Sequence, residues 1–146
     1  MTQEDKDILL RDLCTRLPYG VKIALKNNEA YHHDNVAKIG DVTIDRLKGF
    51  NGKYFSIYHD NPLDWDWYVS EISVEDCKPY LFPLSSMTEE QRKEFELISD
   101  LSYASAYGEE IVYSTKIIDF FNKNHFDYRG LIEKGLAIDA TNLNIY

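Results

Sequence analysis

Residues 42–58 read VTIDRLKGFNGKYFSIY, and the predicted fold depends on this segment. Residues 42–46 and 53–58 are rich in β-branched and aromatic side chains, which favour extended strands. Asn51 and Gly52 lie between them and suit a two-residue hairpin turn, because both turn positions take positive φ. The segment therefore predicts a β-hairpin in which residues 53–58 pair back on the preceding strand.

More strand-like segments flank this hairpin on both sides. Apolar residues alternate with polar ones over residues 21–26 and again over residues 64–69, where two tryptophans alternate with two aspartates. A further short strand is predicted at residues 36–39. A period of two places one face of each strand in the core and the other in water. The sequence therefore predicts a four- to five-stranded antiparallel meander, with closure into a small barrel as an open alternative.

A helix is predicted before the sheet, over residues 3–17. Thr2 and Asp5 can form a capping box at its start, and leucines recur at helical spacing to give one buried face. Pro18 and Gly20 mark the end of this helix.

Two more helices are predicted after the sheet. Thr88 begins the first, because Gln91 three positions later completes a capping box. The second is predicted over residues 114–123, with Ser114 or Thr115 as its N-cap. The fold class is therefore α+β, with an N-terminal helix, the antiparallel meander and then two or more C-terminal helices.

The segment between the sheet and the later helices contains two prolines and is predicted to be extended. It is interpreted as a strap over residues 78–87. The chain is predicted to form a single domain, residues 1–146. Residues 1–77 supply the first helix and the sheet, and residues 88–146 supply a helical part packed on the sheet.

The composition limits the classes of partner. The chain has 146 residues, of which 44% are hydrophobic, and a domain of this size can bury a core. Lys and Arg number 16 against 25 Asp and Glu, so the formal net charge is −9, which argues against nucleic acid as the partner. No apolar run is long enough to span a membrane, and two cysteines without a Cys-x-x-Cys motif indicate reduced thiols. We therefore expect a cytoplasmic protein that makes no membrane contact.

An acidic and aromatic segment is the most distinctive feature of the sequence. Residues 59–77 contain six acids and no Lys or Arg. Tryptophan and tyrosine are frequent anchors of protein interfaces, and the surrounding carboxylates would favour a protein partner with a basic surface. The alternative is that both tryptophans face the core while the aspartates line the solvated side. The candidate partner-binding residues, from this segment and the strap, are Asp64, Trp65, Asp66, Trp67, Tyr68, Tyr80 and Phe82.

A second hypothesis is a nucleic-acid-associated accessory protein. Aromatic residues on strands beside basic ones are typical of platforms for single-stranded nucleic acid. Three basic residues on one hairpin are few for that role, and aromatic residues are common in strands. The candidate nucleic-acid-binding residues are Arg46, Lys48, Lys53, Tyr54 and Tyr58.

Catalytic signatures are missing from the sequence. It has no nucleophile elbow, no paired-histidine zinc helix and no dinucleotide-binding glycine triplet. His32, His33 and Asp34 are adjacent, but a metal site there would need a ligand from elsewhere. We therefore predict no catalytic residue, no metal and no cofactor, and a binding function is favoured over an enzymatic one.

Three longer blocks carry a resemblance. They read LCTRLPYGV at residues 13–21, KPYLFPLSSMTEE at residues 78–90 and HFDYRGLIEKGLA at residues 125–137. Together they resemble a family of small uncharacterised proteins from gut Bacteroides-type bacteria and their phages or mobile elements. The resemblance implies an intracellular origin, and it implies no particular activity.

Overall fold

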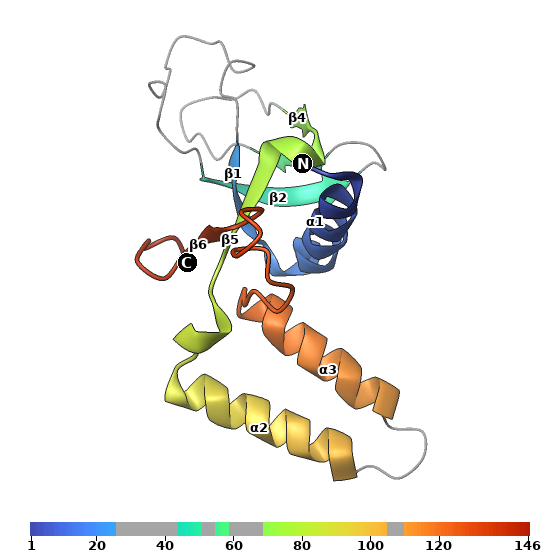
Figure 1. The fold of residues 1–146 in the computed structure, drawn as a ribbon, viewed down its shortest axis with the longest axis vertical. Helices are drawn as coiled ribbons and strands as arrows, with labels where there is room; N and C mark the ends of the chain where they lie inside the picture. Colours follow the sequence, from blue (N-terminus) through green and yellow to red (C-terminus); the bar gives the residue numbers. More distant parts are fainter. Residues whose placement is uncertain (26–43, 51–54, 59–68, 105–109) are drawn as a thin grey trace.

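The structure is a computed structural model that combines helices with a mixed β-sheet (Figure 1). It describes residues 1–25, 44–50, 55–58, 69–104 and 110–146. The helices are α1 (Gln3–Arg16), α2 (Glu89–Ala104) and α3 (Glu110–Lys123). The strands are β1 (Lys22–Leu25), β2 (Ile44–Phe50), β3 (Phe55–Tyr58), β4 (Val69–Ile72), β5 (Cys77–Leu81) and β6 (Ile138–Asp139).

The sheet has the strand order β4-β3-β2-β1-β5-β6. The described strand pairs are antiparallel except β5 with β6, which is parallel. β5 therefore lies next to β1, although β2, β3 and β4 separate the two along the chain (Figure 1). Strands β1, β5 and β6 form a small mixed unit of three strands, of which β1 and β5 contribute residues to the main core.

The predicted four- to five-stranded antiparallel meander is wrong. In a meander each strand pairs with the next one in the chain, whereas β5 returns to β1 and β6 joins β5 in parallel. The described strands also have two ends, β4 and β6, and so do not close into a barrel. Alternation of side chains indicates which residues are extended, but the choice of partner strand depends on contacts far along the chain.

The predicted strap is a strand only in its first four residues, and Leu84–Ser86 within it forms a short 3₁₀ turn. Cys77–Leu81 forms β5, in which Pro79 lies opposite Ile23 of β1. Prolines favour extended backbone in a strap and in a strand alike, so they do not distinguish the two. β6 pairs with Tyr80 and Leu81 and does not reach Pro79, which suits a residue that has no N–H for a second strand.

Helix α1 begins as the sequence predicts. The backbone N–H of Asp5 donates to Thr2 Oγ1 at 3.1 Å, and the backbone N–H of Thr2 donates to Asp5 Oδ2 at 3.0 Å. This capping box is confirmed. A short 3₁₀ turn (Leu17–Tyr19) follows the helix, and Gly20 ends it at a φ of 63°, in the left-handed region that glycine adopts readily.

Helices α2 and α3 form a hairpin that projects away from the sheet (Figure 1). At the start of α2, the N–H of Gln91 donates to Thr88 Oγ1 at 3.2 Å and the N–H of Thr88 donates to Gln91 Oε1 at 2.9 Å, so the predicted capping box is confirmed. The predicted start of α3 is wrong, because the helix begins at Glu110, one turn before Ser114. Ser and Thr favour N-caps but also occur inside helices, where their hydroxyls bond locally.

The Thr88 cap gives a first testable prediction. Thr88→Ala is expected to lower the free energy of unfolding by about 1 kcal/mol, because the N–H of Gln91 loses its acceptor. Thr88→Ser keeps the hydroxyl and is expected to be nearly neutral. Urea denaturation followed by circular dichroism measures both variants, and equal midpoints would contradict this start of α2.

Strands β2 and β3 pair as an antiparallel hairpin, with Arg46 opposite Tyr58 and Phe50 opposite Phe55. The register shifts between Leu47 and Gly49. The predicted turn at Asn51 and Gly52 lies outside the described residues, as do the predicted strand at residues 36–39 and residues 64–68.

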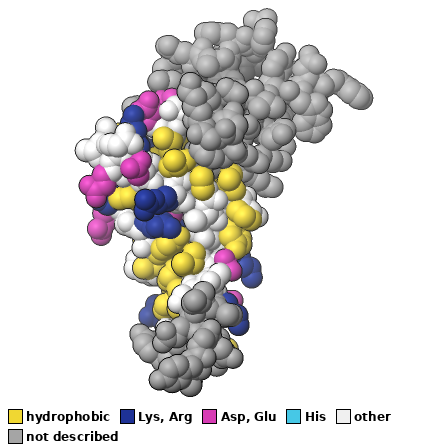
Figure 2. Space-filling model, turned by 90° about the vertical axis from the view of Figure 1, so that its right-hand side faces the viewer, with side chains coloured by type: hydrophobic (Ala, Val, Ile, Leu, Met, Phe, Trp, Pro, Cys, Tyr) yellow, Lys and Arg dark blue, Asp and Glu magenta, His cyan; other side chains and the backbone are white. Residues whose placement is uncertain are grey.

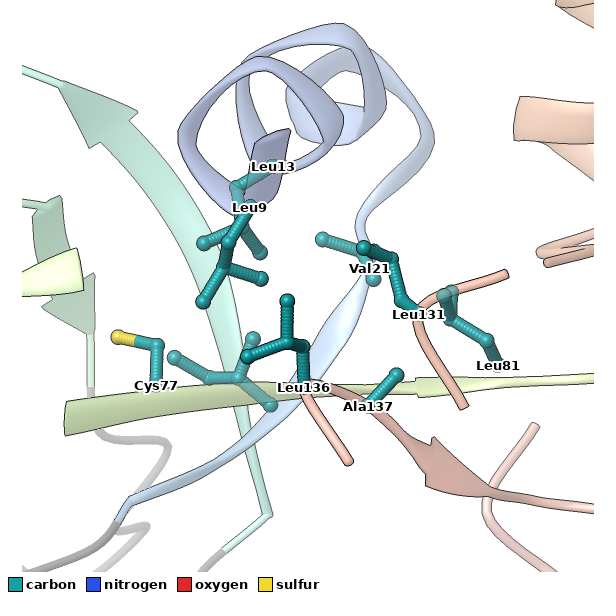
Figure 3. Packing of buried hydrophobic residues seen from close by; sticks show 9 residues of the cluster. Leu9, Leu13, Val21, Cys77, Leu81, Leu131, Leu136 and Ala137 are labelled. Carbon is teal, nitrogen blue, oxygen red and sulfur yellow. The ribbon is translucent and has the colours of Figure 1, made fainter. Parts of the chain in front are cut away.

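The main core lies between α1, the sheet and the C-terminal segment. Leu9 and Leu13 point from α1 toward β5, and residues after α3 fill the space beside them (Figure 3). The end of the chain thus packs back on the domain. The buried members of this cluster are Leu9, Leu13, Val21, Ile23, Cys77, Leu81, Leu131, Leu136 and Ala137.

Candidate functional site

A group of charged and aromatic side chains, half of them completely buried, lies where α1 meets the segment that follows α3. It consists of Asp12, Arg16, Tyr128 and Arg129, and is called the Arg16 cluster below. Asp12 and Arg16 are one helical turn apart on α1, and both are completely buried. They share the face of α1 that carries Leu9, since Arg16 follows Leu9 by seven positions.

Arg16 is held by two partners. Its Nε donates to Asp12 Oδ2 at 2.7 Å, and its Nη2 donates to Asp12 Oδ1 at 3.1 Å. Nη2 also donates to the carbonyl oxygen of Phe126 at 2.7 Å. One guanidinium therefore ties α1 to a residue 110 positions away along the chain.

Arg129 brings a second guanidinium to the same carboxylate. Its Nε lies 3.3 Å from Asp12 Oδ1. The ring of Tyr128 contacts both cations, with its centroid 5.3 Å from Cζ of Arg16 and 4.8 Å from Cζ of Arg129. Two positive charges thus face one negative charge inside the cluster.

The turn that carries Tyr128 and Arg129 is fixed by Asp127 and by Phe82. The carboxylate of Asp127 accepts the backbone N–H groups of Leu131 and Ile132, both at 2.8 Å. The N–H of Phe82 donates to the carbonyl of His125 at 2.9 Å, and the N–H of Asp127 donates to the carbonyl of Phe82 at 2.8 Å. The residues just after β5 therefore hold the start of this turn.

His125 lies at the same junction in an unusual conformation. Its φ is 56°, in the left-handed region, where a non-glycine residue is uncommon. Its ring stacks on the ring of Tyr146, with 4.0 Å between centroids. Burial, together with the charges of Arg16 and Lys22, lowers the pKa of His125 to about 4, so the imidazole is neutral at pH 7.

Tyr146 reaches from the C-terminal segment to the sheet. Its hydroxyl accepts the backbone N–H of Lys22 at 3.0 Å and donates to the carbonyl of Tyr80 at 3.0 Å. Burial raises the pKa of Tyr146 to about 12. The hydroxyl is thus a structural donor and acceptor that bridges β1 and β5.

The residues predicted to bind a partner are placed only in part. Tyr80 is 2% exposed and belongs to the core, so its ring is not available as a surface anchor. Phe82 is half-buried, and its ring lies 5.7 Å from that of Tyr146. The remaining candidates lie outside the described residues: Asp64, Trp65, Asp66, Trp67 and Tyr68.

For the residues predicted to bind nucleic acid that it describes, the structure gives backbone positions only. Arg46 and Lys48 lie on β2, and Arg46 is opposite Tyr58 of β3. Lys48 sits where the register shifts. Lys53 and Tyr54 lie outside the described residues.

No residue of the Arg16 cluster was predicted from the sequence to be functional. One signal was present, because Asp12 and Arg16 interrupt the apolar face of α1 with an acid and a base at i, i+4. The partners Tyr128 and Arg129 give no such signal, since their approach depends on long-range folding.

The described cysteines are unsuited to nucleophilic chemistry. Cys14 and Cys77 are both free thiols. Burial, with a smaller contribution from Asp76, raises the pKa of Cys77 to about 12, so that it stays protonated at neutral pH. Within the described ranges no cluster of three metal-ligating side chains occurs. No helix in the described part of the chain is long and apolar enough to cross a membrane.

Comparison with protein-family models, with curated proteins and with solved structures finds no match to this chain. The resemblance noted from the sequence therefore stays a prediction. The function has to be inferred from the geometry.

Proposed function

We propose that this protein is a non-enzymatic protein-binding module whose α2–α3 hairpin presents the binding surface. The observation that carries the proposal is Leu97 of α2, which is 63% exposed on a helix that projects from the sheet. This binding surface differs from the one predicted from the sequence, which consisted of the acidic and aromatic segment and the strap. The acidic and aromatic segment is not needed for it.

The described side chains of the hairpin bury one another only in part. Phe95 of α2 contacts Phe120 and Phe121 of α3, with ring centroids 5.8 and 5.3 Å apart. Phe95 and Ile98 nevertheless stay half-buried. Figure 2 shows hydrophobic side chains over the described part of the visible face of the molecule, with Lys, Arg, Asp and Glu at their margins. Two helices cover one side of each other, so further apolar surface is left for a partner.

The charge of α2 supports a partner with a basic surface. Over residues 89–104 the sequence has five acids and two bases. Glu90 and Glu94 lie seven and three positions before Leu97, which places all three on one side of the helix, and all three are exposed. An apolar residue beside carboxylates fits a partner that offers an apolar contact next to Lys or Arg, since complementary charge steers association.

A cytoplasmic location is part of the proposal. The free thiols Cys14 and Cys77 support it, because reducing compartments keep cysteines unpaired. The predicted kinship with proteins of mobile elements is compatible with an intracellular role.

Affinity capture from the native host, followed by mass spectrometry, tests the proposal. Leu97→Ser is expected to lose the captured partner while the free energy of unfolding changes by about 0.5 kcal/mol or less, as for other surface substitutions. Leu143→Ser is the matched control, because Leu143 is also exposed but lies outside the hairpin. Equal capture by wild type and both variants would contradict the assigned surface.

Charge variants refine this test. Glu90→Gln with Glu94→Gln is expected to slow association with the captured partner and to weaken its dependence on salt. Glu4→Gln on α1 removes an exposed acid elsewhere and is expected to have a smaller effect. Capture of nucleic acid in place of protein would favour the hairpin of β2 and β3, where Arg46 pairs with Tyr58.

A further inference from the structure

The Arg16 cluster contains hydrogen-bond donors without an acceptor. Arg16 Nη1, Tyr128 Oη and Arg129 Nε are all buried and make no hydrogen bond. Arg129 Nε is close to Asp12, but its N–H is not directed at the carboxylate oxygen. The ring face of Tyr128 is a weak acceptor at best for the guanidinium above it. Buried donors of this kind usually have an acceptor, because a buried donor without a hydrogen bond costs free energy.

The charge of the cluster is also unbalanced. Asp12 is the carboxylate that both guanidinium groups contact. The nearby Asp127 has its two oxygens engaged by the backbone N–H groups of Leu131 and Ile132. His125 is neutral at pH 7 and adds no negative charge. One positive charge therefore lacks a counter-charge among these residues, in surroundings where the side chains of Asp12 and Arg16 are completely buried.

We propose that the Arg16 cluster binds a small oxyanion, the phosphate or carboxylate group of a small-molecule ligand, through Arg129, Tyr128 and Arg16. Guanidinium groups match the oxygens of such anions in geometry and charge, and the Tyr128 hydroxyl supplies a further donor. Asp12 keeps its contact with Nε and Nη2 of Arg16, and the anion takes the donors that Asp12 does not use. This site is separate from the α2 surface proposed above, and each can fail without the other.

The proposed anion enters the cluster from solvent at Arg129. Its side chain is 30% exposed, whereas those of Asp12 and Arg16 are fully covered. In this proposal the Arg129 side chain turns aside to admit the anion, and α1 stays in place. The turn itself stays anchored by Asp127.

Titration of the full chain with sodium phosphate and, separately, with sodium acetate tests the site. Ionic strength is held constant with sodium chloride, because phosphate also stabilises folded proteins by exclusion from their surface. Isothermal calorimetry gives the dissociation constant, and the ¹H–¹⁵N signals of the arginine Nε groups report contact. Saturable binding with shifts of the Arg16 and Arg129 Nε signals is expected.

Three variants locate the binding. Tyr128→Phe removes one donor and keeps the ring that stacks on Phe121, so it is expected to fold and to bind about tenfold more weakly or worse. Arg129→Gln is expected to show a larger loss. Arg11→Gln, at an exposed arginine on the same helix, is expected to bind as wild type does.

The outcomes separate the ligand classes. Saturable binding of phosphate alone assigns a phosphate-bearing ligand, and saturable binding of acetate alone assigns a carboxylate. Absence of saturable binding by either anion would overturn the proposal. Equal weakening in Arg11→Gln and Arg129→Gln would also overturn it, since the binding would then follow net charge and not the cluster.

Discussion

Replacing Arg16 with methionine is expected to lower the free energy of unfolding by about 3–5 kcal/mol, because removing one partner of a buried ion pair leaves the charge of the other uncompensated. Arg16→Met keeps much of the apolar length but removes both hydrogen bonds to Asp12 and the bond to the Phe126 carbonyl. Asp12 is then left buried with Arg129, whose Nε is poorly aligned with it. Urea denaturation followed by circular dichroism measures the loss.

Two comparisons show whether the loss comes from the ion pair. Arg11→Met on the exposed side of α1 is expected to change the free energy of unfolding by about 0.5 kcal/mol or less. Asp12→Leu added to Arg16→Met removes the stranded carboxylate and is expected to recover part of the loss, giving a coupling energy between the two sites. An Arg16→Met variant as stable as Arg11→Met would contradict the role of the cluster.

Acidification is expected to destabilise the protein through His125 over a defined pH range. The pKa of this group is about 4 in the folded protein and about 6.5 in the unfolded chain, so the unfolded chain binds the proton first. Stability from the neutral imidazole is complete above pH 6.5 and is lost progressively as the pH falls to about 4. The shift corresponds to about 3 kcal/mol.

His125→Asn isolates this contribution from that of the carboxylates. Asparagine does not titrate and tolerates the left-handed φ of 56° better than most residues. The difference in free energy of unfolding between wild type and His125→Asn is expected to change by about 3 kcal/mol between pH 7 and pH 4. A difference that stays constant with pH would show that His125 is not buried as a neutral group.

Short sequence patterns correctly predicted those helix starts and strands that depend on a single segment of the chain. The capping boxes at Thr2 and Thr88 involve residues three positions apart, so the sequence contains all of their parts. β1 follows from alternation in the same way. The order of strands did not follow, because Pro79 and its neighbours were equally compatible with a strap and with a strand beside β1.

The Arg16 cluster was likewise predictable from the sequence only in part. The positions of Asp12 and Arg16 on the leucine face of α1 were visible in the sequence. Their partners were not, since Arg16 meets Phe126 across 110 residues and the turn at Asp127 is fixed by the residue after β5. Exposure of Leu97 also depends on how α2 and α3 sit relative to the sheet, which no local pattern specifies.

Photo-cross-linking in the native host tests the central claim most directly, that the α2–α3 hairpin is where this protein meets its partner. A photoreactive amino acid is placed at position 97 in one variant and at position 143 in the other, since both leucines are exposed. The account predicts a cross-link to another protein from position 97 that is absent from position 143. Cross-links of equal yield from both positions, or from position 143 alone, would contradict it.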